Sequence, residues 1–389
     1  MLAYELNNVS LPPTLADMNW VELLELAKRH AIMPLLYSAA KVMSDVPDKV
    51  VQTFRSAAIA SAMNNERKLA AQDEVLKLLM ANDIKCAVLK GSSCAVHYPH
   101  PELRQMGDID ILVESRELEK VHELVQTIGY VYQEHQHEFH RGYIKAANQS
   151  YIEIHYSISE FPLREKAQLA KRYMENALEH IHVVTICEHS IPVLDDEYQA
   201  ISLLVHMERH MFVSEIGIRQ LLDWLMMISS VNEFNNKLPE LYRLFGLTIF
   251  ARSLNAICAE RLNACKAPKE DANKNVIEAL LKKIVSGGNL NGSIVSNNCY
   301  SFVKNASNES VIKICDPIVK KYIRIINRKV KYEFPELDYK LLHPVFWVFY
   351  PIRWYVGLMM KRTKRRNAKD VFLATQNETA LYDELQLYE

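Results

Sequence analysis

The sequence is short of glycine and has no long hydrophobic run. Each of these features excludes a class of fold. Glycine supplies 10 of the 389 residues, where average usage of about 7% would give more than twice that number. Scarce glycine beside abundant leucine, alanine, lysine and glutamate favours helices over a turn-rich β-sandwich. No uninterrupted apolar run of about 20 residues occurs, so we expect no membrane-spanning helix.

The seven cysteines show no paired spacing. No Cys-x-x-Cys motif occurs, which argues against a zinc ribbon or a redox centre. Free thiols in a reducing compartment are the simplest interpretation. The N-terminus carries neither the basic region nor the apolar region of a secretion signal, and we therefore expect a cytoplasmic protein. The cysteines are Cys86, Cys94, Cys187, Cys258, Cys265, Cys299 and Cys315.

Neither sign of charge dominates the chain. Lys plus Arg total 46 and Asp plus Glu total 47, which excludes a histone-like polycation and an acidic disordered tail. Hydrophobic residues make up 49% and charged residues 24% of the chain, as in ordinary globular proteins. The length suits two or three domains.

The pattern of apolar residues predicts one α/β segment between helical regions. Residues 85–90 and 108–113 are short apolar runs, and residues 150–157 alternate as a strand would. Two further strands, over 182–185 and 191–194, are expected at the sheet edge. The fold class is therefore α/β, in the α+β sense, with a small mixed sheet flanked by helices. The expected domains are an N-terminal helical segment (1–66), the α/β core (67–195), a helical domain (196–285) and a basic C-terminal helical region (286–389).

The C-terminal region is basic and partly aromatic. Residues 313–369 contain fifteen Lys and Arg residues against four Asp and Glu. Within them, residues 345–366 join an aromatic and aliphatic stretch to a basic cluster. This stretch fits a buried helix or, alternatively, peripheral contact with the inner face of an anionic membrane. No known nucleic-acid motif accompanies it, so we expect no nucleic-acid partner. Oligomeric state is not encoded in any motif.

Two aspartates and a glutamate are the clearest candidates for a catalytic site. Successive side chains of a strand alternate between faces, so Asp108 and Asp110 share one face while apolar neighbours enter the other. Glu153 lies on a later strand, and it completes a three-carboxylate cluster if the two strands are adjacent. Such a hard oxygen site suits one or two Mg²⁺ or Mn²⁺ ions. Solvated carboxylates at strand ends are the alternative interpretation.

A second motif follows the first predicted strand. Gly91 and Ser92 open a short predicted helix whose first N–H groups favour anions, and glycine lets a phosphate approach closely. Lys90 and Arg104 are candidate counter-charges, and an arginine has the geometry for a two-pronged phosphate contact. A plain strand-to-helix turn, a solvated Lys90 and an Arg104 paired with a carboxylate are the alternatives.

Two pairs of helical residues lie one turn apart. His206 and His210 suit hydrogen bonding that supports the site better than metal binding, because no third ligand accompanies them. Arg219 and Asp223 are also four residues apart, and we expect them to form an ion pair.

Together these motifs resemble the DNA polymerase β-like nucleotidyltransferase superfamily. More narrowly, they are similar to an uncharacterised bacterial nucleotidyltransferase family that is often associated with surface-polysaccharide gene clusters. Ile218 stands where that family has leucine, and the phosphate loop lacks a second glycine. The matching segments are LKGSS at 89–93, YPHPELRQMGDIDILV at 98–113, YIEIHY at 151–156, LLVHMERH at 203–210 and IRQLLDW at 218–224.

The resemblance implies an enzyme that moves a nucleoside monophosphate from an NTP to an unidentified hydroxyl or phosphate acceptor, releasing pyrophosphate. It implies catalytic and metal-binding roles for Asp108, Asp110 and Glu153, with Mg²⁺ or Mn²⁺ as cofactor and ATP or another NTP as substrate. The glycine-serine loop would hold the β- and γ-phosphates. The alternative is a non-catalytic nucleotide-binding or partner protein that docks at the membrane near enzymes of polysaccharide biosynthesis.

Overall fold

The computed structural model divides the chain into two compact units, Met1–Tyr300 with Asn377–Glu389, and Ser301–Gln376. The second unit lies outside the described residues, and so does the predicted membrane-contact stretch 345–366. In the part of the chain that is described, no helix is long and apolar enough to span a bilayer. The structure describes residues 1–7, 10–11, 15, 17–133, 139–158, 165–213, 215–230, 237–263, 273–288, 381–382 and 384–387.

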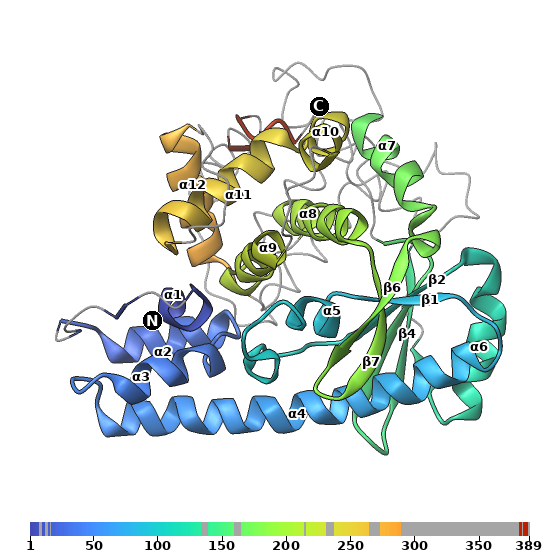
Figure 1. Cartoon of the computed structure of the whole chain (residues 1–389), viewed down its shortest axis with the longest axis horizontal. Helices are drawn as coiled ribbons and strands as arrows, with labels where there is room; N and C mark the ends of the chain where they lie inside the picture. Colours follow the sequence, from blue (N-terminus) through green and yellow to red (C-terminus); the bar gives the residue numbers. More distant parts are fainter. Residues whose placement is uncertain are drawn as a thin grey trace, which may run out of the picture. The chain divides into compact units, whose positions relative to one another are not determined.

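The first unit contains a seven-stranded mixed sheet, which lies on the right in Figure 1. Its strand order is β3-β4-β5-β2-β1-β7-β6. Strands β2 and β5, and likewise β1 and β7, pair in parallel, whereas the other neighbours are antiparallel. This confirms the expected fold class. The strands are β1 (Cys86–Leu89), β2 (Ile109–Val113), β3 (Val131–Gln133), β4 (His140–Lys145), β5 (Ser150–His155), β6 (Ile181–Ile186) and β7 (His189–Leu194).

The prediction that 191–194 is an edge strand is wrong. Strand β7 lies inside the sheet, between β6 and β1, and Val88 pairs with Val193. The whole of Ile191–Leu194 is buried, which an edge strand with one solvated side would not require. Of these two predicted strands, only β6 lies at an edge of the sheet.

One face of the sheet packs against two helices. Leu69 and Val75 of α4 (Asp48–Met80) and Val121 of α6 (Leu118–Thr127) join a buried cluster with Ile111 and Ile154 of the strands. The alternation of β2 and β5 sends these isoleucines to the helix-covered face and their carboxylate neighbours to the other. The packing therefore determines which face carries the polar side chains.

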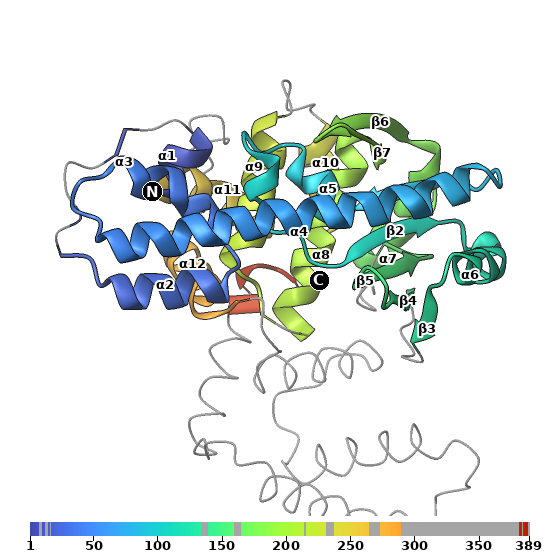
Figure 2. The same ribbon diagram turned by 90° about the horizontal axis from the view of Figure 1, so that it is seen from below.

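Helix α4 is the longest element of the described chain and joins two regions (Figures 1 and 2). Its first half packs against α3 (Tyr37–Val42), and its second half packs against α6 and strands of the sheet. The expected boundary between residues 66 and 67 falls inside this unbroken helix, so the N-terminal helices and the α/β core share it. The other N-terminal helices are α1 (Leu2–Asn7) and α2 (Trp20–Arg29).

Helices that follow the sheet complete the unit. Helix α8 (Asp196–Val213) packs against β7 and α9, while α9 (Ile218–Ser230) contacts α5 (Gly91–Ala95). Trp224 of α9 is fully buried, and its indole N–H donates to Oδ1 of Asn255 at 2.9 Å. The remaining helices are α7 (Glu165–Met174), α10 (Lys237–Leu244), α11 (Thr248–Arg261) and α12 (Lys274–Ser286).

Candidate active site

Asp110 and Glu153 lie side by side on the face of the sheet that α4 and α6 leave uncovered. Strands β2 and β5 pair in parallel with Asp110 opposite Glu153, and with Ile111 opposite Ile154. Directly opposite residues share a face. The two carboxylates therefore project together, as the alternation in the sequence requires if the strands are neighbours.

His155 connects these two carboxylates. Its Nε2 atom lies 2.9 Å from Oδ1 of Asp110 and 3.3 Å from Oε2 of Glu153, and its ring is fully buried. Burial lowers the pKa of His155, but its hydrogen bonds to Asp110 and Glu153 outweigh burial and raise the pKa overall. The imidazole, which shares their face of the sheet, therefore links the two carboxylates.

Lys90 supplies a positive charge at the same point. Its Nζ atom lies 2.8 Å from Oδ1 of Asp110. Burial raises the pKa of the Asp110 carboxyl, but Lys90 and His155 outweigh burial and hold the pKa well below its ordinary value. Asp110 is thus ionised and forms an ion pair with the ammonium group of Lys90.

Asp108 is the third carboxylate, and it precedes β2 at an exposed position. Partial desolvation raises its pKa, and the negative charges of Asp110 and Glu153 raise it further. These shifts place Asp108 within electrostatic reach of the other two carboxylates. Divalent cations would relieve the mutual repulsion of the three groups.

The donor set fits a hard divalent cation. Three carboxylates from two adjacent strands supply the oxygen ligands that Mg²⁺ and Mn²⁺ prefer. Among the described residues, the ligand atoms that all lie within 4.8 Å of one another belong to a different grouping, His140, Glu153 and His155, which shares only Glu153 with the three carboxylates. Residues of both groupings could hold a metal. His140 joins the second grouping through the pairing of β4 with β5, which sets it opposite His155.

The loop after β1 has an unusual backbone. Lys90 has φ +51° and Gly91 has φ +45°, a region that costs an L-residue about 1–2 kcal/mol. Gly91 and Ser92 are the first two residues of α5, so no carbonyl of that helix can accept from their N–H groups. They remain the parts of this loop suited to a phosphate.

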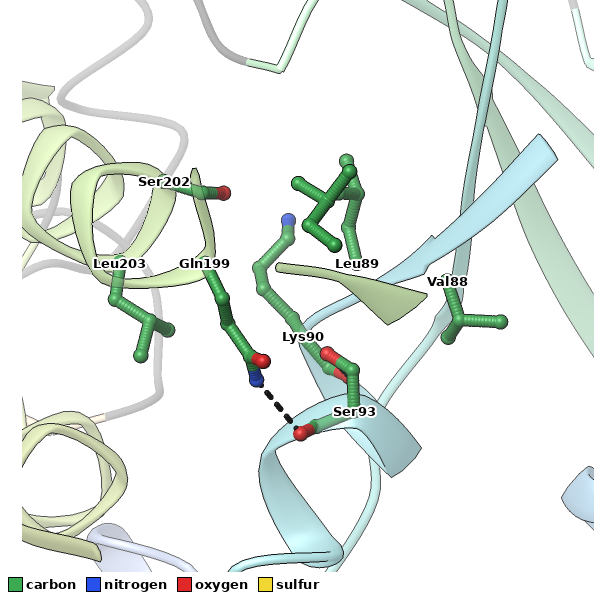
Figure 3. A pocket seen from close by; sticks show the side chains of 8 residues that line it. Val88, Leu89, Lys90, Ser93, Gln199, Ser202 and Leu203 are labelled. Atoms are coloured by element: carbon green, nitrogen blue, oxygen red, sulfur yellow. Dashed lines mark hydrogen bonds between the residues drawn. The ribbon is translucent and has the colours of Figure 1, made fainter. Parts of the chain in front are cut away.

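The side chains of this loop have partners within the protein. Ser92 is buried and its Oγ donates to Oε1 of Gln72 at 2.8 Å, while Oγ of Ser93 donates to the carbonyl oxygen of Lys90 at 2.8 Å. Figure 3 shows Lys90 and Ser93 beside Gln199, whose Nε2 donates to the carbonyl oxygen of Ser93 at 2.7 Å. The cavity between them measures about 10 Å³, room for no more than one water molecule. A nucleotide therefore cannot enter behind the loop.

Arg104 lies in a buried ion pair. Its Nε atom lies 2.8 Å from Oδ1 of Asp223, and one terminal nitrogen lies 2.7 Å from Oδ2. The hydroxyl of Tyr98 donates to the same Oδ1 at 2.8 Å. The phosphate contact predicted for Arg104 stays a prediction, because two of its donors are already engaged. The expected Arg219–Asp223 pair is wrong, since Asp223 binds Arg104 and Arg219 donates to the carbonyl oxygen of Gln105 at 3.2 Å.

Three polar residues of α4, which sequence reasoning missed, hold both loops of the site. Asn65 donates to the carbonyl oxygens of Glu102 and Arg104, Lys68 donates to those of Met106 and Gly107, and Gln72 accepts from Ser92. The only signal in the sequence is their spacing at i, i+3 and i+7, which places them on one helix face.

His206 and His210 of α8 pack edge to face, with ring centroids 4.4 Å apart. Burial lowers the pKa of both rings, to about 3 for His210, and the charge of Lys90 lowers both further. Both rings are therefore neutral near pH 7, and the effect of Lys90 shows that they lie on the side of the site where that lysine lies.

Two solved structures are similar, although distantly so. One is a lincosamide antibiotic adenylyltransferase, LnuA, bound to lincomycin, with 15% identity, 40% of this chain and 92% of that chain covered, and a TM-score of 0.28. The other is an antigenic nucleotidyltransferase-like protein from Paracoccidioides brasiliensis, with 12% identity, 55% and 97% coverage, and a TM-score of 0.36. No curated protein matches the chain.

A family model covers most of the described part of the chain. The model for uncharacterised nucleotidyltransferases matches residues 16–263. That range includes the whole sheet, the Gly91 loop, all three carboxylates and the ion pair between Arg104 and Asp223. The match therefore spans the elements that build the site, and the chain belongs to the uncharacterised nucleotidyltransferase family.

Proposed function

We propose that the protein transfers a nucleoside monophosphate from an NTP to an acceptor and releases pyrophosphate. One observation carries this proposal: the sheet brings Asp110 and Glu153 side by side, with Asp108 in electrostatic reach of both. A purely structural role would not require three mutually repelling carboxylates beside one another. The family assignment supports the same class of reaction.

Each residue of the site has a role that follows from its position on the sheet. Asp108 and Asp110 would hold divalent cations together with Glu153. Such ions, when bound, activate the attacking oxygen and stabilise the charge on the leaving group. The backbone N–H groups of Gly91 and Ser92 would bind the β- and γ-phosphates beside β1. Lys90 would neutralise Asp110 until the cations bind.

The reaction balances as an in-line displacement at the α-phosphorus. The acceptor oxygen forms a bond to the α-phosphorus while the bond from that phosphorus to the oxygen bridging the α- and β-phosphates breaks. Pyrophosphate leaves with the electron pair of the broken bond. The proton of the acceptor passes to the carboxylate of Glu153, which lies next to Asp110. The NTP and the acceptor are the partners that this proposal requires.

Transfer of radioactive label tests the proposal. Each NTP labelled at the α-phosphate is incubated with Mg²⁺, the protein and small molecules extracted from its host. We expect wild type to transfer label from at least one NTP, and Asp108→Asn and Asp110→Asn to lose at least about 100-fold. Glu119→Gln is the matched control, because Glu119 is an exposed carboxylate paired with Arg141. Equal incorporation by the aspartate variants, or none by wild type, would contradict the proposal.

A further inference from the structure

A second cavity lies among α1, α9 and the segment that follows α5. It measures about 670 Å³, within the range of about 300–1,000 Å³ that small-molecule sites occupy. Both α1 and α9 lie on the side of α5 away from the sheet (Figures 1 and 2). The described wall of this cavity includes no residue of the Gly91 loop and none of the three carboxylates. We call it the α1–α9 cavity, and its wall includes Tyr4, Glu5, Leu6, Ser38, Met226 and Ser229.

Glu5 of α1 brings a buried carboxylate into this wall. It is 8% exposed, although glutamate is seldom so buried without a partner for its charge. Ser38 of α3 donates a hydrogen bond to Oε2 of Glu5, whereas Oε1 has no partner among the residues that the structure describes. One hydroxyl does not compensate for the removal of a carboxylate from water, and burial accordingly raises the pKa of Glu5. The carboxylate therefore lacks a donor that a ligand can supply.

The charges around Glu5 favour a cation in the cavity. His100 lowers the pKa of Glu5 and Glu102 raises it, and these two residues face each other with 3.5 Å between Nδ1 and Oε1. Burial lowers the pKa of His97, so this ring of the wall is neutral near pH 7. The described wall contains no lysine or arginine. The cavity is therefore unsuited to a phosphate and suited to a positively charged group.

The rest of the wall is partly apolar. Tyr4 and Leu6 of α1 and Met226 of α9 supply apolar surface. Ser229, also of α9, has a buried Oγ with no hydrogen-bond partner in the described part of the chain. A largely apolar wall with a few polar groups that fix orientation is typical of sites for small organic molecules. The wall therefore suits a compound with an apolar body and a polar end.

The cavity is accessible from solvent. Pro99, His100 and Ser230 belong to its wall, and all three are exposed. A small molecule can therefore enter between the segment after α5 and the end of α9 without opening the core.

We propose that the α1–α9 cavity binds an organic ammonium compound, whose charged group lies at Glu5 and whose apolar body packs between Leu6 and Met226. A protonated amine donates hydrogen bonds and neutralises the carboxylate in a single contact, and charge-assisted hydrogen bonds are the strong ones. An alcohol brings a donor without the charge, and an anion is repelled. Binding at this cavity is independent of the reaction proposed above, so failure of nucleotidyl transfer would leave it intact.

Three probes of similar size separate the effect of charge from that of shape. Phenethylamine, phenethyl alcohol and phenylacetate are cationic, neutral and anionic near neutral pH. Isothermal titration calorimetry measures the affinity of the full chain for each. We expect the amine to bind at least about tenfold more tightly than the alcohol, the effect of one charge-assisted hydrogen bond, and the anion to bind most weakly. Equal affinities for the three probes, or no binding of the amine, would overturn the proposal.

Variants test whether the amine binds at Glu5. Glu5→Gln keeps the shape of the side chain and removes its charge, so the affinity for phenethylamine should fall at least about tenfold. The same variant should bind phenethyl alcohol as wild type does. Glu25→Gln is the matched control, because Glu25 is an exposed carboxylate of α2, and it should bind the amine as wild type does. Unchanged binding of the amine by Glu5→Gln would overturn the proposal.

Competition distinguishes this cavity from the candidate active site. A fluorescent ATP analogue with Mg²⁺ should bind the protein equally well with and without phenethylamine, because the described walls of the two sites share no residue. Displacement of the analogue by the amine would place the amine at the carboxylate cluster and overturn the proposal.

A further measurement locates the amine without a change at Glu5. In protein with ¹³C-labelled methionine methyl groups, phenethylamine should shift the resonance of Met226, which lines the cavity and is assigned with Met226→Leu. Met63 is the control, because its side chain is 71% exposed on α4. A titration that shifts other methionine resonances and spares Met226 would overturn the proposal even where calorimetry detects binding.

Discussion

Arg104 and Asp223 form a two-pronged ion pair across 119 residues of sequence, with distances of 2.8 Å and 2.7 Å between their paired atoms. Both side chains are buried, at 4% and 6% exposure. The pair joins the segment before Asp108 to α9. A buried pair of this kind contributes less than its distances imply, but removing one partner leaves an uncompensated charge.

We therefore predict that Arg104→Ala lowers the free energy of unfolding by about 3–5 kcal/mol. Arg104→Lys should recover only part of this loss, because an ammonium cannot reproduce the two-pronged contact. Urea denaturation measures both. Arg141→Ala is the control, since its partner Glu119 is 76% exposed, and it should cost less than about 1 kcal/mol. Equal costs for Arg104→Ala and Arg141→Ala would refute this account.

The second prediction concerns Asn65 of α4. It is buried and binds the segment before Asp108 three times, donating to the carbonyl oxygens of Glu102 (3.0 Å) and Arg104 (2.9 Å) and accepting from the N–H of Met106 (3.1 Å). Each orphaned buried group costs about 1–3 kcal/mol. Asn65→Ala should therefore destabilise the protein by at least about 2 kcal/mol and also reduce nucleotidyl transfer.

A neighbouring residue provides the comparison for Asn65. Asn64 accepts a hydrogen bond from Arg67 on the exposed side of α4, so Asn64→Ala should lie within about 0.5 kcal/mol of wild type. Thermal and urea unfolding of both variants, with the labelling assay at a temperature where both are folded, separates stability from activity. Similar behaviour of the two variants would show that Asn65 does not hold the loop.

The strands that carry the carboxylates could be predicted because their information is local. Alternation of apolar and polar residues around Asp110 and Glu153 predicts both strands and the face of each side chain. The structure places these strands at Ile109–Val113 and Ser150–His155. The sequence predicts the carboxylate cluster only on the condition that the two strands are adjacent, since no residue pattern specifies which strands become neighbours.

The partners of Arg104 and Ser92 could not be predicted, because these contacts are not local in the sequence. Asp223 and Gln72 lie far from them in sequence, and each reaches its partner only when α9 and α4 have packed on the core. The spacing of Arg219 and Asp223 favours a local pair. Burial of Arg104 beside Asp223 in the folded protein overrides that local preference.

A substitution at Gly91 tests whether the backbone of the loop after β1 binds the nucleotide. Its φ of +45° is strained for any L side chain, although an added Cβ would meet only the carbonyl oxygen of Asp108 at an ordinary 3.6 Å. Gly91→Ala should thus cost about 1–2 kcal/mol from backbone strain, and it should weaken binding of the ATP analogue. Gly107→Ala is the matched control, because a Cβ there meets nothing within 4 Å and φ is not positive. If both variants bind the analogue equally, the loop does not hold the nucleotide.

His189 joins β7 to α4 and makes stability depend on pH. Its Nδ1 lies 2.8 Å from Oδ2 of Asp73, and its Nε2 lies 3.2 Å from Oε1 of Glu66. Burial lowers the pKa of His189, but the two carboxylates outweigh burial, so the folded protein holds the proton more tightly than the unfolded chain. The stabilisation is therefore complete below the unfolded histidine pKa of about 6.5 and is lost as pH rises through the folded value.

The stability difference between wild type and His189→Gln should accordingly be larger near pH 5.5 than near pH 8.5, because the folded ring gives up its proton as pH rises. Urea denaturation at both pH values measures it. Asp73→Asn removes the shorter of the two contacts and should flatten the pH dependence of wild type, whereas Asp83→Asn, at the turn after α4, should leave it unchanged. A difference that grows with pH would mean that the neutral ring is the form that stabilises the contact with α4, and would reverse the assigned direction of the pKa shift.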